Sequence, residues 1–412
     1  MLIKVYPYLF VFLALTTVGQ WLSINWWAPN LTISFIEWCF CFLILVYPTF
    51  KYQHLKIMSK IGAYKLLNIF LFYTLYLSLY SIVKYHNIER SDLAALLSYC
   101  MAMLSCILIY SLSYPYWMFK ALRILYKYLP FIVIIYAPFA RNQAYGDLLG
   151  FLCMPALLLL LFFKELPKKQ KYIWLIITIT IIICSFIGDA RSHVIKYAIA
   201  LLLGITLYWD KFYYKIRHFI WSFFILPFFL LFLGISGIFN IFEVNTYIDS
   251  KSIDEGTIED TRTLVFQEVF MSALNNNYIL TGRGIGKGYE SLFQQNRTSM
   301  TNLKTTELNS SERQSEVGIL NIFTWGGIIY VVLFTLFCIS VVYYGLYKSK
   351  NRLSRNCAIF FAFYFFYSWV ENFQSFSISF ISSWCMVALC ISPHFRKMNN
   401  MEFKEYINTL LK

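Results

Sequence analysis

The chain has 412 residues, of which 59% are hydrophobic and only 14% are charged. This composition excludes an ordinary soluble enzyme and is typical of a membrane protein. The apolar residues form continuous runs rather than short alternating strands, which excludes an outer-membrane barrel. The net charge of +14 is therefore interpreted as a signal of membrane topology, and no nucleic-acid partner is expected.

Twelve apolar runs follow one another along the chain, each near the roughly 20 residues that a membrane-spanning helix needs. The fifth run carries Lys120, Arg123 and Lys127 in its first half, so an interfacial helix followed by a shorter span is an alternative there. We expect an all-α polytopic membrane protein with about 12 transmembrane helices. The runs lie near residues 6–24, 32–50, 64–83, 93–113, 121–140, 146–163, 172–187, 194–209, 219–241, 318–346, 356–370 and 375–392.

The segments between the runs alternate in charge. One set, which includes both termini, contains 23 of the 35 lysines and arginines but only four of the 21 acidic residues. Cytoplasmic loops are rich in Lys and Arg, so both termini are predicted to be cytoplasmic. The predicted organisation is nine transmembrane helices in 1–241, a large exoplasmic loop between spans 9 and 10 in 242–317, three further spans in 318–392 and a cytoplasmic tail in 393–412.

The large loop has three parts with different patterns. Residues 243–260 are acidic and predict a solvated loop, with a divalent-cation site as the alternative. Residues 287–312 are polar and predict an irregular loop. Between them, apolar residues at helical spacing predict an amphipathic helix over 262–275 that packs on the membrane-embedded part. These residues are Val265, Phe266, Val269, Phe270, Ala273 and Leu274.

The first candidate site is the short turn 188–193, followed by Lys196, between two short apolar runs. An arginine such as Arg191, drawn towards the hydrocarbon, is costly unless it lines a polar cavity or has a partner. A functional cation would explain it. A pair of Asp189 with Arg191 or Lys196 that caps the helix ends would explain it equally well.

The second candidate site combines Arg262, at the start of the amphipathic helix, with the run Gly-Arg-Gly-Ile-Gly-Lys-Gly at 282–288. Gly284 and Gly286 would let the backbone approach an anion and donate N–H groups beside Arg283 and Lys287. Phosphate is the natural ligand for this pattern. The alternative is a flexible glycine turn, since no strand-turn-helix context suits a dinucleotide fold.

The third candidate site is Glu316, which lies where the chain enters the tenth run. Loss of water there would make its carboxylate a stronger base, whereas a helix-start pair with Arg313 is the alternative.

A fourth group lies between the last two runs, where Glu371, Asn372 and Gln374 stand beside Trp369. Polar groups beside an aromatic ring suit sugar binding. A tight hairpin with interfacial aromatic residues is the alternative.

The order of these features resembles the O-antigen polymerase (Wzy-type) and O-antigen ligase superfamily. The family pattern is matched by Arg191 in an exoplasmic turn, Arg262 opening a helix in the large loop, and the glycine run 282–286. It is completed by a polar residue, here Glu316, eleven positions before Gly327. In the ligases that polar residue is typically His, so Glu316 favours a polymerase. The specific part of the resemblance covers residues 188–327.

This resemblance implies a GT-C-type, metal-independent glycosyltransferase of the bacterial inner membrane with its large loop in the periplasm. It would join undecaprenyl-diphosphate-linked oligosaccharide repeat units into O-antigen or a related surface polysaccharide, with no cofactor. Arg191 and Arg262, assisted by Arg283 or Lys287, would bind the diphosphate, and Glu316 would orient or deprotonate the acceptor hydroxyl. Membrane lipids and a separate chain-length regulator are the other partners expected.

Three other functions stay open at this point. A ligase would transfer finished polymer to a lipid A-core, and only Glu316 argues against it. A flippase or transporter for lipid-linked oligosaccharides should carry charged residues along a central path within its spans, whereas the charges here cluster at the outer face. A non-catalytic assembly factor with a sugar-binding loop is the third.

Overall fold

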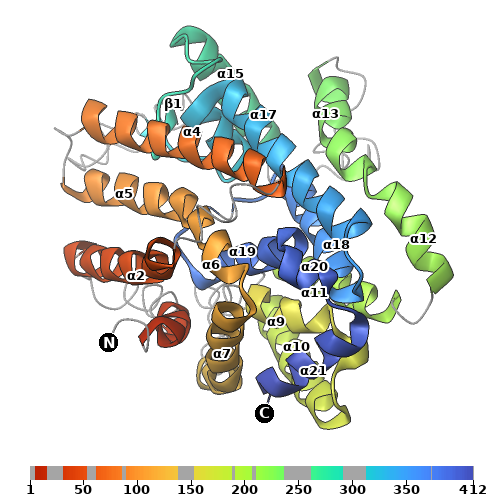
Figure 1. The fold of residues 1–412 in the computed structure, drawn as a ribbon. Helices are drawn as coiled ribbons and strands as arrows, with labels where there is room; N and C mark the ends of the chain where they lie inside the picture. The colour runs from red at the N-terminus through yellow and green to blue at the C-terminus, as the bar shows by residue number, and fades with distance from the viewer. Residues whose placement is uncertain are drawn as a thin grey trace.

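The computed structural model describes residues 5–15, 31–52, 62–85, 90–137, 153–187, 191–206, 210–235, 261–290, 312–372 and 374–411. These residues form an α-helical bundle with one small antiparallel pairing of two-residue strands (Figure 1). The acidic run 243–260, the turn 188–190 and most of the polar stretch 287–312 lie outside the described residues.

The N-terminal half consists of a first helix, Val5–Leu15, and the elements that follow it. They are α2 (Leu31–Lys51), α4 (Gly62–Lys84), α5 (Arg90–Leu104), η1 (Ser105–Ile107), α6 (Leu108–Leu112), α7 (Pro115–Tyr136), α9 (Cys153–Leu160), η3 (Phe163–Glu165), α10 (Lys168–Ile187) and α11 (Arg191–Thr206). The remainder comprises α12 (Asp210–Phe219), α13 (Ser222–Ile235), α15 (Thr261–Asn275), β1 (Tyr289–Glu290), β2 (Glu312–Arg313), α17 (Gly318–Tyr347), α18 (Arg352–Tyr367), α19 (Ile378–Ile391), α20 (Pro393–Lys397) and α21 (Asn400–Leu411).

Each of the twelve predicted apolar runs overlaps a helix of the structure. Among the described helices, α4, α10 and α17 are long and apolar enough to cross a membrane. A fourth span is formed if Leu96–Leu112 and Pro115–Ile135, which are bent by 116°, count as one. The prediction of several apolar helices is thus confirmed, and the count of twelve spans stays a prediction.

The outer faces of these helices are as apolar as their inner faces. In α4, Leu67, Phe70 and Leu77 point into the bundle. The outward face of the same helix exposes Phe72, which is 69% accessible, and Val83, which is 72% accessible. A helix that is apolar all round needs an apolar surrounding on its outer side as well. The chain is therefore typical of an α-helical membrane protein.

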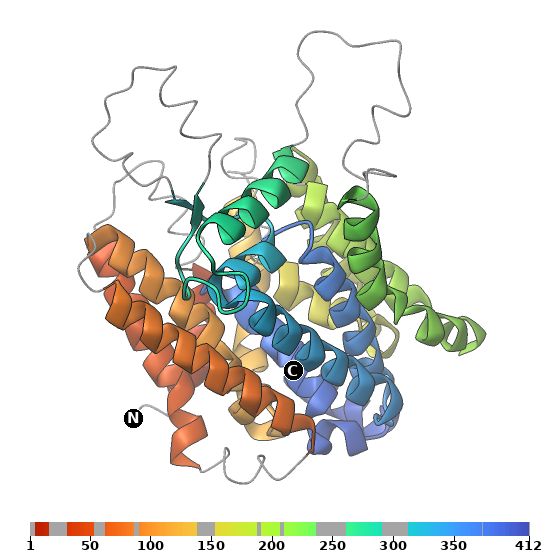
Figure 2. The same cartoon turned by 90° about the horizontal axis from the view of Figure 1, so that it is seen from above.

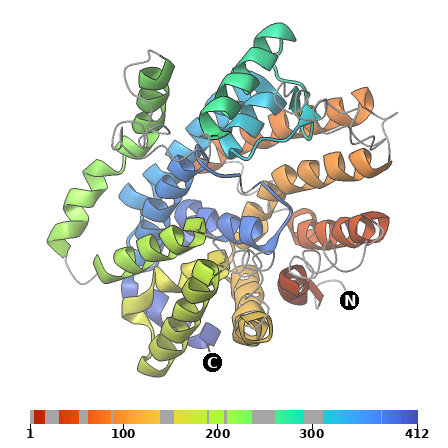
Figure 3. The same cartoon turned by 180° about the vertical axis from the view of Figure 1, so that it is seen from behind.

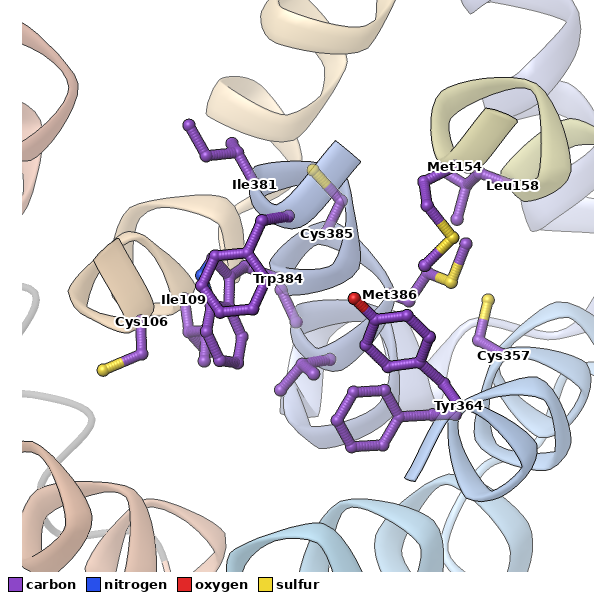
Figure 4. Close-up of a cluster of buried hydrophobic side chains, with 14 of the residues drawn as sticks. Cys106, Ile109, Met154, Leu158, Cys357, Tyr364, Ile381, Trp384, Cys385 and Met386 are labelled. Carbon is purple, nitrogen blue, oxygen red and sulfur yellow. The ribbon is translucent and has the colours of Figure 1, made fainter. Parts of the chain in front are cut away.

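The centre of the bundle is α19, which is buried on almost all sides by α6, α9, α17 and α18. Figure 4 shows Trp384 of this helix on the side of Ile109, with Met154 and Leu158 on the other side. The Trp384 indole N–H donates to the Ser105 hydroxyl at 2.8 Å, which satisfies the one polar group of that ring. Layers of helices flank this centre, with α2, α4 and α5 on one side and α12 and α13 on the other (Figure 3).

The last residues of the chain fold back on the bundle as α20 and α21. The Tyr406 hydroxyl donates to the carbonyl of Pro115 at the start of α7, at 3.2 Å. The N–H of Lys350, just after α17, donates to the carbonyl of Arg396 in α20 at 2.9 Å. The C-terminal segment therefore lies at the C-terminal end of α17. Glu316 lies at the opposite end, just before the first residue of α17.

Candidate functional site

The longest helix, α17, is broken about a third of the way along by Gly327, which has φ 65° and ψ −165°. A break leaves the carbonyls of one turn before it and the N–H groups of one turn after it without helical partners. The loop between α15 and β1 supplies those partners. Its main chain forms hydrogen bonds with the main chain of α17 on both sides of the break. Four bonds do this: Arg283 N to Thr324 O (2.8 Å), Gly284 N to Trp325 O (2.9 Å), Ile328 N to Ile279 O (2.8 Å) and Ile329 N to Leu280 O (3.4 Å).

The glycines of this loop are required by close contacts. Gly282, Gly284 and Gly286 have φ values of 70°, 105° and 83°, where other residues are strained. A Cβ on Gly282 would lie 2.3 Å from the backbone of α17, and one on Gly284 would lie 2.4 Å from the hydroxyl of Ser81 in α4. The loop is therefore wedged between α4, α5 and α17 (Figure 2), and it is a packed structure rather than a flexible turn.

This packing changes the role of the glycine run. The N–H groups of Gly282, Arg283, Gly284 and Lys287 already donate to main-chain carbonyls. The carbonyl of Gly286 accepts from the side-chain amide of Gln314 at 2.6 Å. The expected backbone cradle for an anion is thus not supported at Gly284, because its donor is taken, and both Gly284 and Gly286 serve close packing here.

The two cations of the loop lie against aromatic rings. Arg283 donates to the carbonyl of Gly288 at 3.0 Å, lies 3.6 Å from the carboxylate of Glu290, and stands over the ring of Tyr278. The ammonium of Lys287 stands 4.4 Å from the ring centre of Tyr85 at the end of α4. Both cations are half-buried, so they remain close to solvent at one end of the bundle.

The segment 312–317 joins the glycine loop to the start of α17. Its strand β2 pairs with β1, with Arg313 opposite Tyr289. Gln314 then binds both Gly286 and the indole N–H of Trp325, the latter at 3.3 Å. Glu316 follows, and its side chain is exposed. The expected burial of this carboxylate away from water is therefore not seen in the structure.

Lys196 of α11 has a partner that the sequence pattern did not indicate. Its ammonium lies 2.8 Å from the carboxylate of Glu371, in the turn between α18 and α19. The side chain of Lys196 is only 8% exposed and its ammonium also stands over the ring of Tyr367. The first and fourth sequence groups are thus brought together, although 175 positions separate their two charges.

The residues expected to bind sugar take different positions. Trp369 is 8% exposed and its ring packs edge-on against Phe228 of α13, with 4.8 Å between ring centres. That ring has no open face for a sugar, so the stacking role expected for Trp369 is not supported. Asn372 is half-buried, and its side-chain oxygen accepts from the N–H of Gln374 at 3.0 Å. The sugar-binding roles predicted for Glu371 and Asn372 stay predictions.

The predicted amphipathic helix exists as α15 and packs on α17. Phe266, Val269 and Ala273 are buried, and the rings of Phe270 and Phe323 lie 5.2 Å apart. One detail of the prediction is wrong, because Leu274 is 55% exposed. Helical spacing predicts the side of the helix on which a residue lies. It does not predict whether another part of the chain covers that residue.

The two arginines of the family pattern both begin helices. Arg191 is the first residue of α11 and Arg262 is the second residue of α15. Their side chains lie outside the described part of the chain, so the structure places their helices only. Both helices contact this end of the bundle, because Lys196 of α11 reaches Glu371 and Phe270 of α15 packs against Phe323 in the second turn of α17.

Two glutamines at this end connect separate segments, and these contacts were not predicted from the sequence. Gln314 ties the glycine loop to α17, and Gln374 donates to the carbonyl of Gly318 at 3.0 Å. A glutamine in a polar loop resembles any solvated residue, so the sequence did not mark Gln314, and it placed Gln374 in the sugar-binding group without indicating its contact with α17.

Comparison with family models, with curated proteins and with solved structures found no match for this chain.

Proposed function

We propose that the protein is a polytopic glycosyltransferase of the bacterial inner membrane that polymerises undecaprenyl-diphosphate-linked oligosaccharide repeat units at the periplasmic face. The complete proposal has about 12 spans, a GT-C-like arrangement and both termini in the cytoplasm. The observation that supports it best is the convergence of four separate segments near the N-terminal end of α17: α11 through Lys196, α15 through Phe270, residues 312–317 and the turn 368–374.

The charges of the two ends of α17 fit this orientation. Lys348, Lys350 and Arg352 gather at the C-terminal end together with Arg396 and Lys397, as expected for a cytoplasmic face. At the other end the cations stand beside acidic residues: Lys196 lies 2.8 Å from Glu371, Arg283 lies 3.6 Å from Glu290, and Glu316 is exposed. This end would face the periplasm.

The proposed reaction transfers the growing chain from its lipid diphosphate to a sugar hydroxyl of a second lipid-linked unit. The bond between the anomeric carbon and the diphosphate oxygen breaks, and a new bond forms from that carbon to the acceptor oxygen. Arg191 and Arg262, with Arg283 or Lys287, would stabilise the negative charge of the leaving diphosphate. Glu316 would take the proton of the acceptor hydroxyl, and Asn372 would bind a sugar of the acceptor.

The decisive experiment removes the gene and separates the surface polysaccharide on a gel. A polymerase predicts loss of the long ladder with a single repeat unit retained. Accumulation of lipid-linked polymer would instead indicate a ligase, the second candidate.

Substitutions then test the roles of the residues. Glu316→Gln, Arg191→Ala and Arg262→Ala are each expected to lower polymer formation by about 10²-fold or more, because each removes a charge used in the transition state. Lys397→Ala is the control, an exposed cation at the opposite end of α17 that should leave the ladder unchanged. Undiminished polymer in the three variants at normal protein level would reject the proposed mechanism.

A further inference from the structure

The ion pair between Lys196 and Glu371 is the charged contact most enclosed by protein at the candidate site. Lys196 is 8% exposed and Glu371 is 29% exposed, with 2.8 Å between their charged atoms. The ring of Tyr367 covers the ammonium at 5.0 Å from its centre. A buried ammonium is costly without a partner and a favourable surrounding, so this arrangement holds Lys196 in one place.

Glu371 is also attached to α17 through its main chain. Its carbonyl accepts from the N–H of Gly318 at 3.2 Å, and the carbonyl of Ser368 accepts from the N–H of Ile319 at 2.9 Å. These are two of the four N–H groups that a helix start leaves without helical partners. The turn 368–374 therefore caps α17 with its backbone, while it holds α11 with a side chain.

We propose that Lys196 and Glu371 are positioning residues that fix Arg191 relative to Glu316. This inference rests on the proposed function. Glu316 stands two positions before Gly318, and Arg191 starts the helix that carries Lys196, about 7.5 Å away along its axis. The pair thus joins the element that carries the diphosphate-binding cation to the element that carries the base.

The need for such a link follows from the reaction. The diphosphate held by Arg191 and the hydroxyl activated by Glu316 must meet at one anomeric carbon. A displacement of about 1 Å between reacting groups can lower a rate by about 10²-fold. Helices that contact one another only through apolar side chains would shift more easily than helices joined by a directional ion pair.

The test uses the purified full-length protein with lipid-linked repeat units. Lys196→Met and Glu371→Gln should each lower kcat about 10- to 100-fold and change KM by less than about threefold, because the reacting groups are misplaced and binding is kept. Lys196→Arg should keep most of the activity, since a guanidinium can form the same pair and stack on Tyr367. The reversed pair, Lys196→Glu with Glu371→Lys, should recover at least about tenfold over either single variant.

Two further variants separate positioning from stability. Lys196→Met with Glu371→Leu replaces the buried pair by apolar side chains, which is often neutral for folding, and should give folded protein with low kcat. Asn356→Leu removes a buried hydrogen bond from α18 to the carbonyl of Leu161, far from the site. It should lower the unfolding temperature and leave kcat unchanged.

Three results would overturn the proposal. Wild-type kcat in the folded single variants would show that the pair is dispensable. A folded reversed pair as inactive as the single variants would mean that one of the charges contacts substrate directly. Full activity of Glu316→Gln would reject the proposed function itself, and that outcome is recognisable because it concerns a residue outside the pair.

Discussion

The two ends of α17 are held in different ways. In its N-terminal half, main-chain groups of the loop 279–284 complete the hydrogen bonding of the broken helix. At its C-terminal end, side chains share this task with the main-chain bond from Lys350 to Arg396. The amide of Asn351 caps α18 and also donates to the carbonyls of Phe395 and Met398, at 2.8 and 3.2 Å. The break at Gly327 is therefore completed by main-chain groups, whereas the C-terminal end depends in part on a particular side chain.

The difference has a physical reason. Non-helical backbone at membrane depth is stable only where protein or water satisfies its polar groups. The break at Gly327 needs a second strand of chain pressed against it, and only glycines allow that approach. Such a junction ties the large loop to the helix that follows Glu316, so the loop becomes part of the proposed site.

The largest expected effect concerns the two ends of α17, which we expect to lie on opposite sides of the membrane. An introduced cysteine at Glu316, which is exposed, should react with a membrane-impermeant maleimide in intact cells. A cysteine at Lys397, also exposed, should react only after the membrane is permeabilised. The unmodified chain provides the background, since its described cysteines are buried or half-buried. Equal labelling of the two positions in intact cells would contradict opposite locations.

The next largest effect is expected at the break itself. A Cβ at Gly327 would lie 2.2 Å from the carbonyl carbon and oxygen of Leu280, at a φ of +65°. Gly327→Ala should therefore lower the free energy of unfolding by about 3 kcal/mol or more, from backbone strain and overlap together. Thermal unfolding of the detergent-purified protein measures it. The matched control is Gly62→Ala, whose Cβ would meet only the tip of Tyr344 at 3.1 Å and should be tolerated.

A smaller effect is expected where a side chain reinforces the backbone-held region. Gln314→Leu removes the bonds to Gly286 and to the indole of Trp325. Each such bond contributes about 1 kcal/mol, so the free energy of unfolding should fall by about 1 to 2 kcal/mol. The same unfolding assay would show this shift. A loss as large as that of Gly327→Ala would mean that side chains, not the main chain, hold the loop in place.

Sequence patterns predicted the helices well where the pattern is local. Continuous apolar runs located a helix at each of the twelve predicted positions, and the spacing of Phe266, Val269 and Ala273 located α15. Both patterns involve residues only a few positions apart, so they can be recognised without knowledge of the fold. The glycine run was found by the same means, although its use as a wedge between helices was not.

The candidate site was predicted less completely because its contacts join distant segments. The sequence offered Asp189 as an alternative partner for Arg191 or Lys196, whereas the folded chain pairs Lys196 with Glu371. Trp369 was predicted to bind sugar because it is an aromatic residue beside polar side chains. In the structure its ring packs against Phe228. Each of these outcomes depends on which helix stands next to which, and no local pattern encodes that neighbour.

The sequence by itself determined an apolar helical chain with one polar insertion and an alternation of charge between successive polar segments, because hydropathy and charge are properties of each segment. Only the tertiary structure decided that the insertion closes a broken helix and that an ion pair of the buried Lys196 joins α11 to the turn that caps α17. Both features exist because buried polar groups must find partners, and the partners are supplied by segments far away in the chain.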